Sequence, residues 1–144
     1  MVFRSTYTEA KGDIICAGLA EGRSLLSICE SAEISYEAAK NWERDVPEHA
    51  TKSARAREIG CHALADQCLS IADTPQIGRV VTTKPDGAEE TRHEDMIAHR
   101  RLRIETRMRL LGKWLPRVYG DKVDMHHSGT INLSGELAGL NDEG

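Results

Sequence analysis

Cysteines and histidines are the side chains with the most reactive chemistry in this sequence, and their spacing argues against a metal centre. No two cysteines form a C-x-x-C pair, and the histidines do not complete a zinc pattern beside them. His126 and His127 are adjacent, but neighbouring residues of a strand point to opposite faces and do not easily chelate one ion. We therefore predict no metal site and no cofactor. The expected state of the four cysteines is a free, buried thiol in a reducing compartment: Cys16, Cys29, Cys61 and Cys68.

Phosphate-binding and hydrolytic motifs are also missing from the sequence. It contains neither G-x-x-x-x-G-K-[ST] nor G-x-G-x-x-G, the loops that hold nucleotide phosphates. Asp66 and Asp73 stand seven residues apart on one predicted helix, where solvation accounts for both. The sequence thus predicts no catalytic residue and a protein that is not an enzyme.

Charge is divided into blocks along the chain. Residues 1–50 carry five basic and nine acidic side chains, residues 96–120 carry seven basic and one acidic, and residues 121–144 carry one basic and five acidic. A basic block between acidic ones indicates a polyanionic partner or complementary packing between subunits.

A pair of short helices near the N-terminus has the layout of a DNA-binding unit. Residues 6–21 are predicted to form a first helix that ends before Gly22 and has one apolar stripe: Ile14, Ile15, Gly18 and Leu19. Ser24 then caps a second helix that reaches residue 29 or 30. After a turn at 32–34, Ser35 caps a third helix over residues 36–44. Helix, short turn and helix in this order are typical of the helix-turn-helix motif, whose second helix enters a major groove.

The third helix carries the residue types that contact DNA. Serine and tyrosine hydroxyls suit phosphates, whereas asparagine and arginine reach base edges. Three basic residues near the start of the next helix, Lys52, Arg55 and Arg57, lie beside this unit. The predicted DNA-binding residues are Ser35, Tyr36, Lys40, Asn41, Arg44, Lys52 and Arg55.

Two longer helices are predicted in the middle of the chain. The first runs from Pro47 to about Asp73, and its apolar positions are mostly small and follow heptad-like steps: Ala50, Ala54, Cys61, Ala65, Cys68 and Ala72. The second starts at Glu94 or Asp95 and runs to about Leu115, with arginines on its other faces and one apolar stripe: Ile97, Ile104, Met108, Leu111 and Leu115. We expect the two to form an antiparallel helical hairpin that also packs on neighbouring subunits.

Strands are predicted in two places. Residues 79–83 and 88–93 flank a Lys-Pro-Asp-Gly turn and predict a small exposed hairpin within 76–93. Residues 122–127 and 130–133 predict a ribbon that is not stable alone and invites pairing with copies of itself in a closed ring. The predicted subunit contacts are Ala54, Cys61, Ala65, Cys68, Ile104, Arg107, Met108, Leu111, Val123, Met125 and Ile131.

Together these elements predict a mainly α-helical fold. The chain of 144 residues has few large side chains, so oligomerisation is expected to supplement a modest core. No apolar run approaches the roughly 18 residues of a membrane span, and the N-terminus has no apolar core of signal-peptide length, so we expect an intracellular protein without a membrane partner.

The predicted organisation is a helix-turn-helix domain at 1–46, a helical oligomerisation domain at 47–120, C-terminal strands of an inter-subunit barrel at 121–134, and a flexible, acidic tail at 135–144 whose Leu137 and Leu140 can anchor a partner.

The order of these elements resembles the small terminase subunits of tailed bacteriophages. The stretch RLRIETRMRLLGKWLPRVYGDKV is similar to a characteristic block of one branch of that family, in which an Arg-rich helix runs into a Trp, a Pro and a Tyr-Gly-Asp-Lys segment. The matching residues here are Arg103, Arg107, Trp114, Pro116, Tyr119, Gly120, Asp121 and Lys122. The resemblance covers residues 13–133, and the hairpin within 76–93 looks like an insertion.

The resemblance implies a non-enzymatic component of viral genome packaging. Such proteins form rings, recognise double-stranded viral DNA at the start of packaging, and recruit and regulate the large terminase subunit, which holds the ATPase and nuclease. The site of action would be the cytoplasm of the infected bacterial host. DNA recognition in the family falls on the N-terminal helices, which here carry Ser35, Tyr36, Lys40, Asn41 and Arg44.

Two other functions remain open from the residues. A dimeric helix-turn-helix transcriptional regulator needs only two-fold symmetry and a matching half-site spacing. A purely structural interaction module with no nucleic-acid role would fit the acidic N-terminal region. The Tyr-Gly-Asp-Lys block and the predicted terminal strands favour the terminase.

Overall fold

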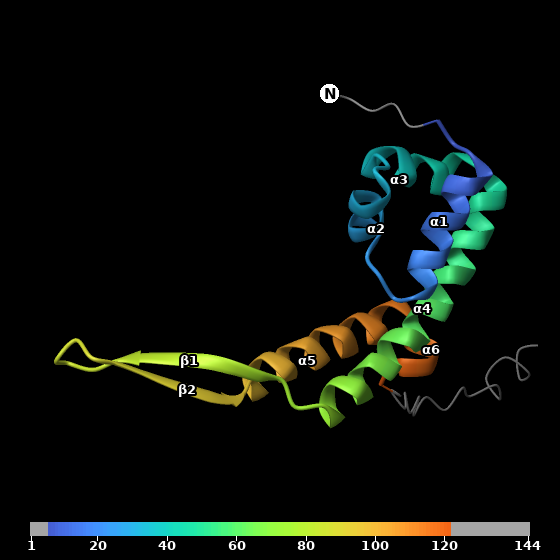
Figure 1. The fold of residues 1–144 in the computed structure, drawn as a ribbon. Helices are drawn as coiled ribbons and strands as arrows, with labels where there is room; N and C mark the ends of the chain where they lie inside the picture. Colours follow the sequence, from blue (N-terminus) through green and yellow to red (C-terminus); the bar gives the residue numbers. More distant parts are fainter. Residues whose placement is uncertain (1–5, 122–144) are drawn as a thin grey trace, which may run out of the picture.

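The computed structural model describes residues 6–121, so the predicted C-terminal strands and tail lie outside the described residues. Within that range the chain is mainly helical, with one small antiparallel sheet (Figure 1). The elements are α1 (Glu9–Ala20), α2 (Leu25–Ala32), α3 (Tyr36–Asp45), α4 (Pro47–Asp73), β1 (Ile77–Thr83), β2 (Glu89–Asp95), α5 (Ile97–Trp114) and α6 (Pro116–Tyr119). No helix in residues 6–121 is both long and apolar enough to span a bilayer.

Side-chain caps fix the starts of the first three helices. The hydroxyl oxygens of Thr8, Ser24 and Ser35 each accept a hydrogen bond from a backbone N–H three residues later. These caps satisfy donors that have no partner inside the helix. The caps predicted at Ser24 and Ser35 are confirmed, whereas α1 starts at Glu9 rather than at residue 6 because Thr8 caps it.

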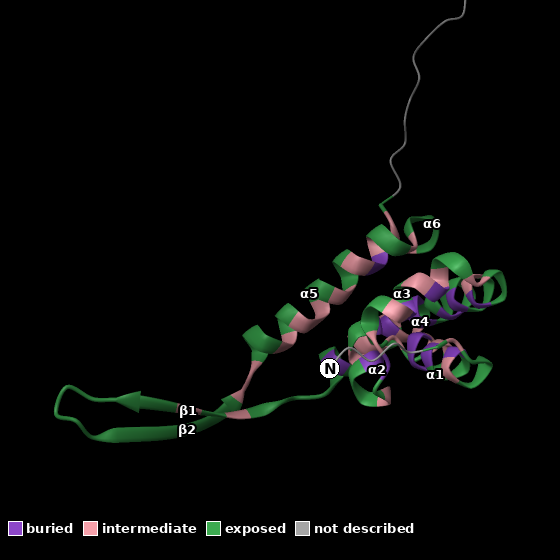
Figure 2. Ribbon diagram, turned by 90° about the horizontal axis from the view of Figure 1, so that it is seen from above, coloured by how far each residue is buried: buried purple, intermediate pink, exposed green. Residues whose placement is uncertain are grey.

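A first core lies where α1, α2 and α3 pack against the N-terminal half of α4 (Figure 2). Ile15, Ile28 and Ala39 are almost completely buried there, and Trp42 closes the cluster from α3. Ala56 of α4 belongs to the same cluster, so the packing unit extends past residue 46. Ile14 of the predicted apolar stripe is exposed, because the buried face of α1 runs through Gly12, Ile15, Gly18 and Leu19.

α1 and α4 approach so closely that their crossing needs glycine. A Cβ placed on Gly60 would collide with the backbone carbonyl of Leu19, and Gly22, with φ of +80°, lies directly beside it. The buried face of α4 is accordingly small and partly polar, and comprises His49, Ser53, Ala56, Gly60, Cys61, Leu64 and Ile71. Ala54 and Ala72 of the predicted apolar stripe lie outside this buried face and are exposed in the protomer.

A second, smaller core joins α4 to α5. Cys61, Leu64 and Leu111 are buried together, and Leu115 and Tyr119 pack at its edge. The Arg100 guanidinium contacts the end of α4 and Arg107 contacts Gln67, so the two helices run antiparallel as predicted. The predicted start of α5 at residue 94 or 95 is wrong because both residues pair in β2, and the helix begins at Ile97. Of the predicted apolar stripe, Leu111 is buried, whereas Ile97 and Met108 are exposed in the protomer.

The hairpin projects away from both cores as an arm (Figure 1). β1 and β2 pair in antiparallel register from Ile77 opposite Asp95 to Thr83 opposite Glu89. Gly87 takes a φ of +83° in the turn, where its N–H donates to the Lys84 carbonyl at 2.9 Å. The predicted hairpin is confirmed, and nearly all of its residues are exposed (Figure 2).

Candidate nucleic-acid interface

One exposed stripe of α3 carries three of the residues predicted to contact DNA. Tyr36, Lys40 and Arg44 follow one another at four-residue steps, which places them on the same side of the helix. The Lys40 ammonium lies over the Tyr36 ring, 5.9 Å from its centroid. Asn41, also on α3, is half-buried, and the Ser35 hydroxyl accepts from the Ala38 N–H at 3.3 Å as the helix cap.

Charge along this stripe is not uniform. The Arg44 guanidinium donates to both carboxylate oxygens of Asp45, at 2.8 and 3.0 Å. This hydrogen bond lowers the pKa of Asp45 and raises the pKa of Arg44 from their ordinary values, so both groups stay charged at neutral pH. Lys40 has no acidic partner among residues 6–121, and its positive charge is therefore the uncompensated one on the stripe.

The basic residues at the start of α4 divide between two sides of the molecule. Lys52 pairs with Glu9 of α1 at 3.6 Å, and the Glu9 charge raises the pKa of Lys52. Arg55 is exposed and lies one turn further along the same side. Arg57 instead pairs with Glu43 of α3 at 2.6 Å. The structure thus brings Arg57, rather than Lys52 or Arg55, next to the α3 stripe.

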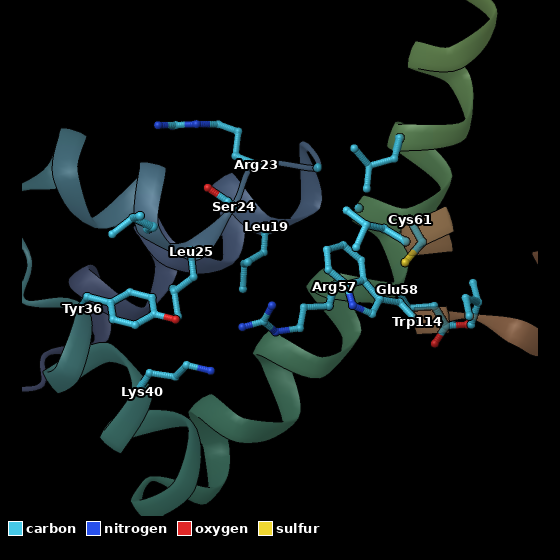
Figure 3. Close-up of a pocket in the computed structure, with 16 residues that line it drawn as sticks. Leu19, Arg23, Ser24, Leu25, Tyr36, Lys40, Arg57, Glu58, Cys61 and Trp114 are labelled. Carbon is cyan, nitrogen blue, oxygen red and sulfur yellow. The ribbon is translucent and has the colours of Figure 1, made fainter. Parts of the chain in front are cut away.

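A groove connects the stripe to the rest of the molecule. It has a volume of about 610 Å³ and lies between the α2–α3 pair and the α4–α5 hairpin. Tyr36 and Lys40 line it from α3, and Arg57 lines it from α4 (Figure 3). Arg23 also lines the groove and was missed by sequence reasoning, because nothing in the sequence places the residue after Gly22 beside α3.

The cysteines and the potential metal ligands of the described residues do not form a cluster. All four cysteines fall in this range and are free, and burial raises the pKa of the thiols of Cys16, Cys29 and Cys61. A raised pKa keeps a thiol protonated and unreactive at neutral pH. Residues 6–121 contain no group of three or more His, Cys, Asp or Glu that could hold a metal. His126 and His127 lie outside the described residues.

The residues predicted to form subunit contacts have three different environments. Ala54 and Met108 are exposed, whereas Ala65, Cys68, Ile104 and Arg107 are half-buried in the contact between α4 and α5. Cys61 and Leu111 are buried within the protomer, where they pack in the second core. Val123, Met125 and Ile131 lie outside the described residues. Among the members of the set that the structure describes, the exposed pair is the most accessible to another chain.

Comparison with known proteins gives a consistent match. Residues 7–126 match the family model described as "Bacteriophage Sf6, terminase small subunit-like". Crystal structures of the terminase small subunit gp1 of the bacterial virus Sf6, carrying different single substitutions, resemble the chain with a TM-score of 0.64 and 26% sequence identity. The similarity covers 88% of this chain and 87% of that one. Among curated protein sequences, none matches the chain.

Proposed function

This chain belongs to the family of phage terminase small subunits similar to that of Sf6, whose role is in phage DNA packaging, and from that premise we propose that it recognises phage DNA as a ring-forming oligomer. In this proposal α2 and α3 act as a helix-turn-helix unit and α3 meets the DNA. The exposed Tyr36–Lys40 stripe is the observation that carries the assignment of the DNA-contacting face.

The chemistry of the stripe suits a phosphate backbone next to a groove. An ammonium without a carboxylate partner is free to displace a counterion from phosphate, which is the main sequence-independent source of DNA affinity. The Tyr36 hydroxyl and the Asn41 amide add hydrogen-bonding groups on the same helix. Because Arg44 is held by Asp45, its contribution is expected to be smaller than that of Lys40.

Exposed apolar side chains on α4 and α5 support assembly with other copies. Leu69, Leu102 and Met108 are each at least 60% exposed. Large exposed apolar groups that recur along one pair of helices are typical of surfaces that pack against another chain. In the proposed ring the α3 helices of many copies lie around the outer edge. Avidity then offsets the weak contact that each copy makes with DNA.

The remaining parts of the proposal follow from the family. The protein recruits and regulates the large terminase subunit, works without catalytic activity of its own, and acts in the cytoplasm of the infected bacterial host. Native mass spectrometry separates this assembly from a dimeric transcriptional regulator, because a closed species of many subunits is expected and a dimer would contradict it.

Titration with double-stranded DNA at several salt concentrations tests the α3 assignment. Lys40→Ala is expected to weaken binding for all sequences and to reduce the slope of log affinity against log salt by about 1, the effect of one lost phosphate contact. Lys84→Ala is the matched control, since Lys84 lies in the arm and pairs with Glu90 at 3.4 Å. Coincident curves for Lys40→Ala and the unmodified protein would place the DNA elsewhere.

A further inference from the structure

The groove beside α3 is apolar at its base and open to solvent. Leu19, Leu25 and Leu64 form its inner wall, and Trp114 and Leu26 line its opening with 59% and 54% of their surface exposed. Figure 3 shows these walls coming from separate elements, with Tyr36 and Leu25 on one side and Cys61 on the other. A concave apolar surface of this size with a few polar groups at its rim is typical of a binding site.

The charged residues at the rim of the groove indicate the charge of the segment that would bind there. Two of the four charged rim residues are already paired: Arg57 with Glu43, and Glu58 with Arg117 at 3.2 Å. Arg23 donates only to serine oxygens, those of Ser27 and Ser31. Within residues 6–121 this leaves Arg23 and Lys40 without an acidic partner. The groove therefore favours a segment that combines apolar side chains with negative charge.

The chain itself contains such a segment beyond the described residues. Residues 133–144 carry three leucines, three acidic side chains and no basic ones. The described chain ends at Asp121, only a few residues after Trp114 and Leu115, which line the groove. The twelve residues from 122 to 133 span up to about 40 Å when extended. The segment can therefore reach back to the groove, near which the described chain ends.

We propose that residues 133–144 dock into the groove of their own chain, with Leu137 and Leu140 against Trp114 and the acidic side chains near Arg23 and Lys40. Tethering favours this contact, because a short linker gives an effective concentration in the millimolar range. The docked segment covers Tyr36 and Lys40, so it competes with DNA for the α3 stripe. That competition rests on the proposed function, whereas the docking does not.

Tryptophan quenching in the full-length protein tests the docking. The sequence has two tryptophans, and Trp42 is only 7% exposed, so acrylamide reports mainly on Trp114. A segment bound in such a pocket buries most of its own surface against the lining, and Trp114 is 59% exposed without it. Leu137→Asp with Leu140→Asp is therefore expected to raise the quenching constant roughly twofold. Leu137→Met with Leu140→Met is the matched control and leaves it unchanged. Equal quenching in the two double variants would overturn the proposal, and Trp114→Phe verifies the source of the signal.

A photo-crosslinking residue at position 140 identifies the surface that is contacted. Crosslinks to groove peptides of the same chain are expected, and mixtures of isotope-labelled and unlabelled subunits distinguish chains. Crosslinks that join a labelled to an unlabelled chain would overturn docking within one chain and assign the groove to a neighbour's tail. Crosslinks confined to surfaces outside the groove would overturn the proposal altogether.

DNA titration of the same aspartate variant distinguishes docking of the tail from contact between the α3 stripe and DNA. Release of the tail is expected to increase DNA affinity severalfold, an effect that Lys40→Ala removes. If Trp114 becomes accessible and DNA affinity stays the same, the docking stands and the assignment of DNA to the α3 stripe fails. If DNA affinity increases while Trp114 quenching is unchanged, the docking fails and the DNA assignment stands.

Discussion

The N-terminal bundle and the β-hairpin arm are stabilised in opposite ways. The bundle buries a continuous cluster that includes Ile15, Ile28 and Trp42, and each of its first three helices has a side-chain cap. The arm buries almost nothing along its length and has only its own ladder of hydrogen bonds. A two-stranded hairpin alone is marginal in water, so the position of the arm depends on what holds its base.

The arm has no core of its own, and contacts at its base hold it in place. Arg100 of α5 donates to the Ile71 carbonyl at 3.0 Å, to the Ala72 carbonyl, and to the Asp95 carboxylate at the end of β2. The other Asp95 oxygen accepts from the Gln76 N–H at 3.0 Å. Met96 packs against Gly78 of β1. The bundle is thus held by distributed burial, whereas the arm is held by a few polar contacts at one end.

The largest expected difference comes from one substitution made in both regions. Ile28→Ala in the bundle is expected to cost about 2–5 kcal/mol of unfolding free energy, because it removes a buried side chain and leaves a cavity. Ile77→Ala in the arm, where the side chain is 64% exposed, is expected to change the stability by less than about 0.5 kcal/mol. Urea denaturation of both variants checks this. Similar losses would show that the arm shares the cooperative core.

Paired glycine substitutions test the close crossing of α1 and α4. Gly60→Ala is expected to destabilise the protein by about 1–3 kcal/mol, since the new methyl group must push α1 away. Gly112→Ala is the control in α5, where a Cβ meets only the Tyr119 carbonyl oxygen at 3.7 Å, an ordinary contact. Because alanine is the better helix former, this control is expected to gain about 0.5–1 kcal/mol. Thermal unfolding of the two proteins compares them, and a stable Gly60→Ala variant would refute the requirement for glycine.

Removing the arginine at the base of the arm is expected to loosen the arm with little effect on the bundle. The Arg100 side chain is 14% exposed, so Arg100→Ala leaves one oxygen of the Asp95 carboxylate and two carbonyls of α4 without their donor. Losing such a charge-assisted contact costs about 1–3 kcal/mol. Hydrogen exchange of amides in 77–95 is expected to accelerate by about tenfold or more, the equivalent of 1.4 kcal/mol. Amides of α1 and α2 provide the internal control, and equal acceleration there would mean global destabilisation instead.

The smallest expected effect concerns a buried imidazole in the bundle. His49 lies beneath Tyr7, with ring centroids 5.6 Å apart, and neither ring nitrogen has a hydrogen-bond partner in the described part of the chain. Desolvation lowers the pKa of His49; Lys52 acts in the same direction and Glu43 against it. As pH falls through the pKa of the unfolded state, about 6.5, the unfolded chain takes up a proton that the folded chain resists, so stability decreases.

Replacing that imidazole isolates its contribution. His49→Leu is expected to flatten the loss of stability between pH 7 and pH 5, because the apolar side chain takes up no proton in either state. Urea midpoints measured across this range give the comparison. An identical decline in the variant would assign the pH dependence to other groups.

Sequence patterns predicted the helices well where local signals mark their ends. Ser24 and Ser35 are caps, Pro47 opens α4, and the Lys-Pro-Asp-Gly turn places the hairpin, so these boundaries follow from nearby residues alone. Which face of a helix is buried depends on partners far along the chain. For that reason the spacing grouped Ala54, Ile97 and Met108 with apolar stripes but did not show that they are exposed in the protomer.

The candidate site was predictable in part for the same reason. Tyr36, Lys40 and Arg44 share a helix, so their spacing sufficed to group them. The pairing of Arg44 with Asp45 depends on side-chain rotamers, and the separation of Lys52 from Arg57 depends on how α4 packs between α1 and α3. Arg23 enters the groove only because α2 folds back beside α3, which no local pattern shows.

The 27-residue helix α4 connects the N-terminal bundle to the base of the β-hairpin arm. Its first half forms part of the bundle core, its second half supports α5, and its last carbonyls hold the base of the arm through Arg100. At 1.5 Å per residue the helix is about 40 Å long. A tilt of about 5° at the bundle end would move the far end by about 3.5 Å over that length. Because α4 is one unbroken helix from Pro47 to Asp73, such a tilt would carry the base of the arm with it.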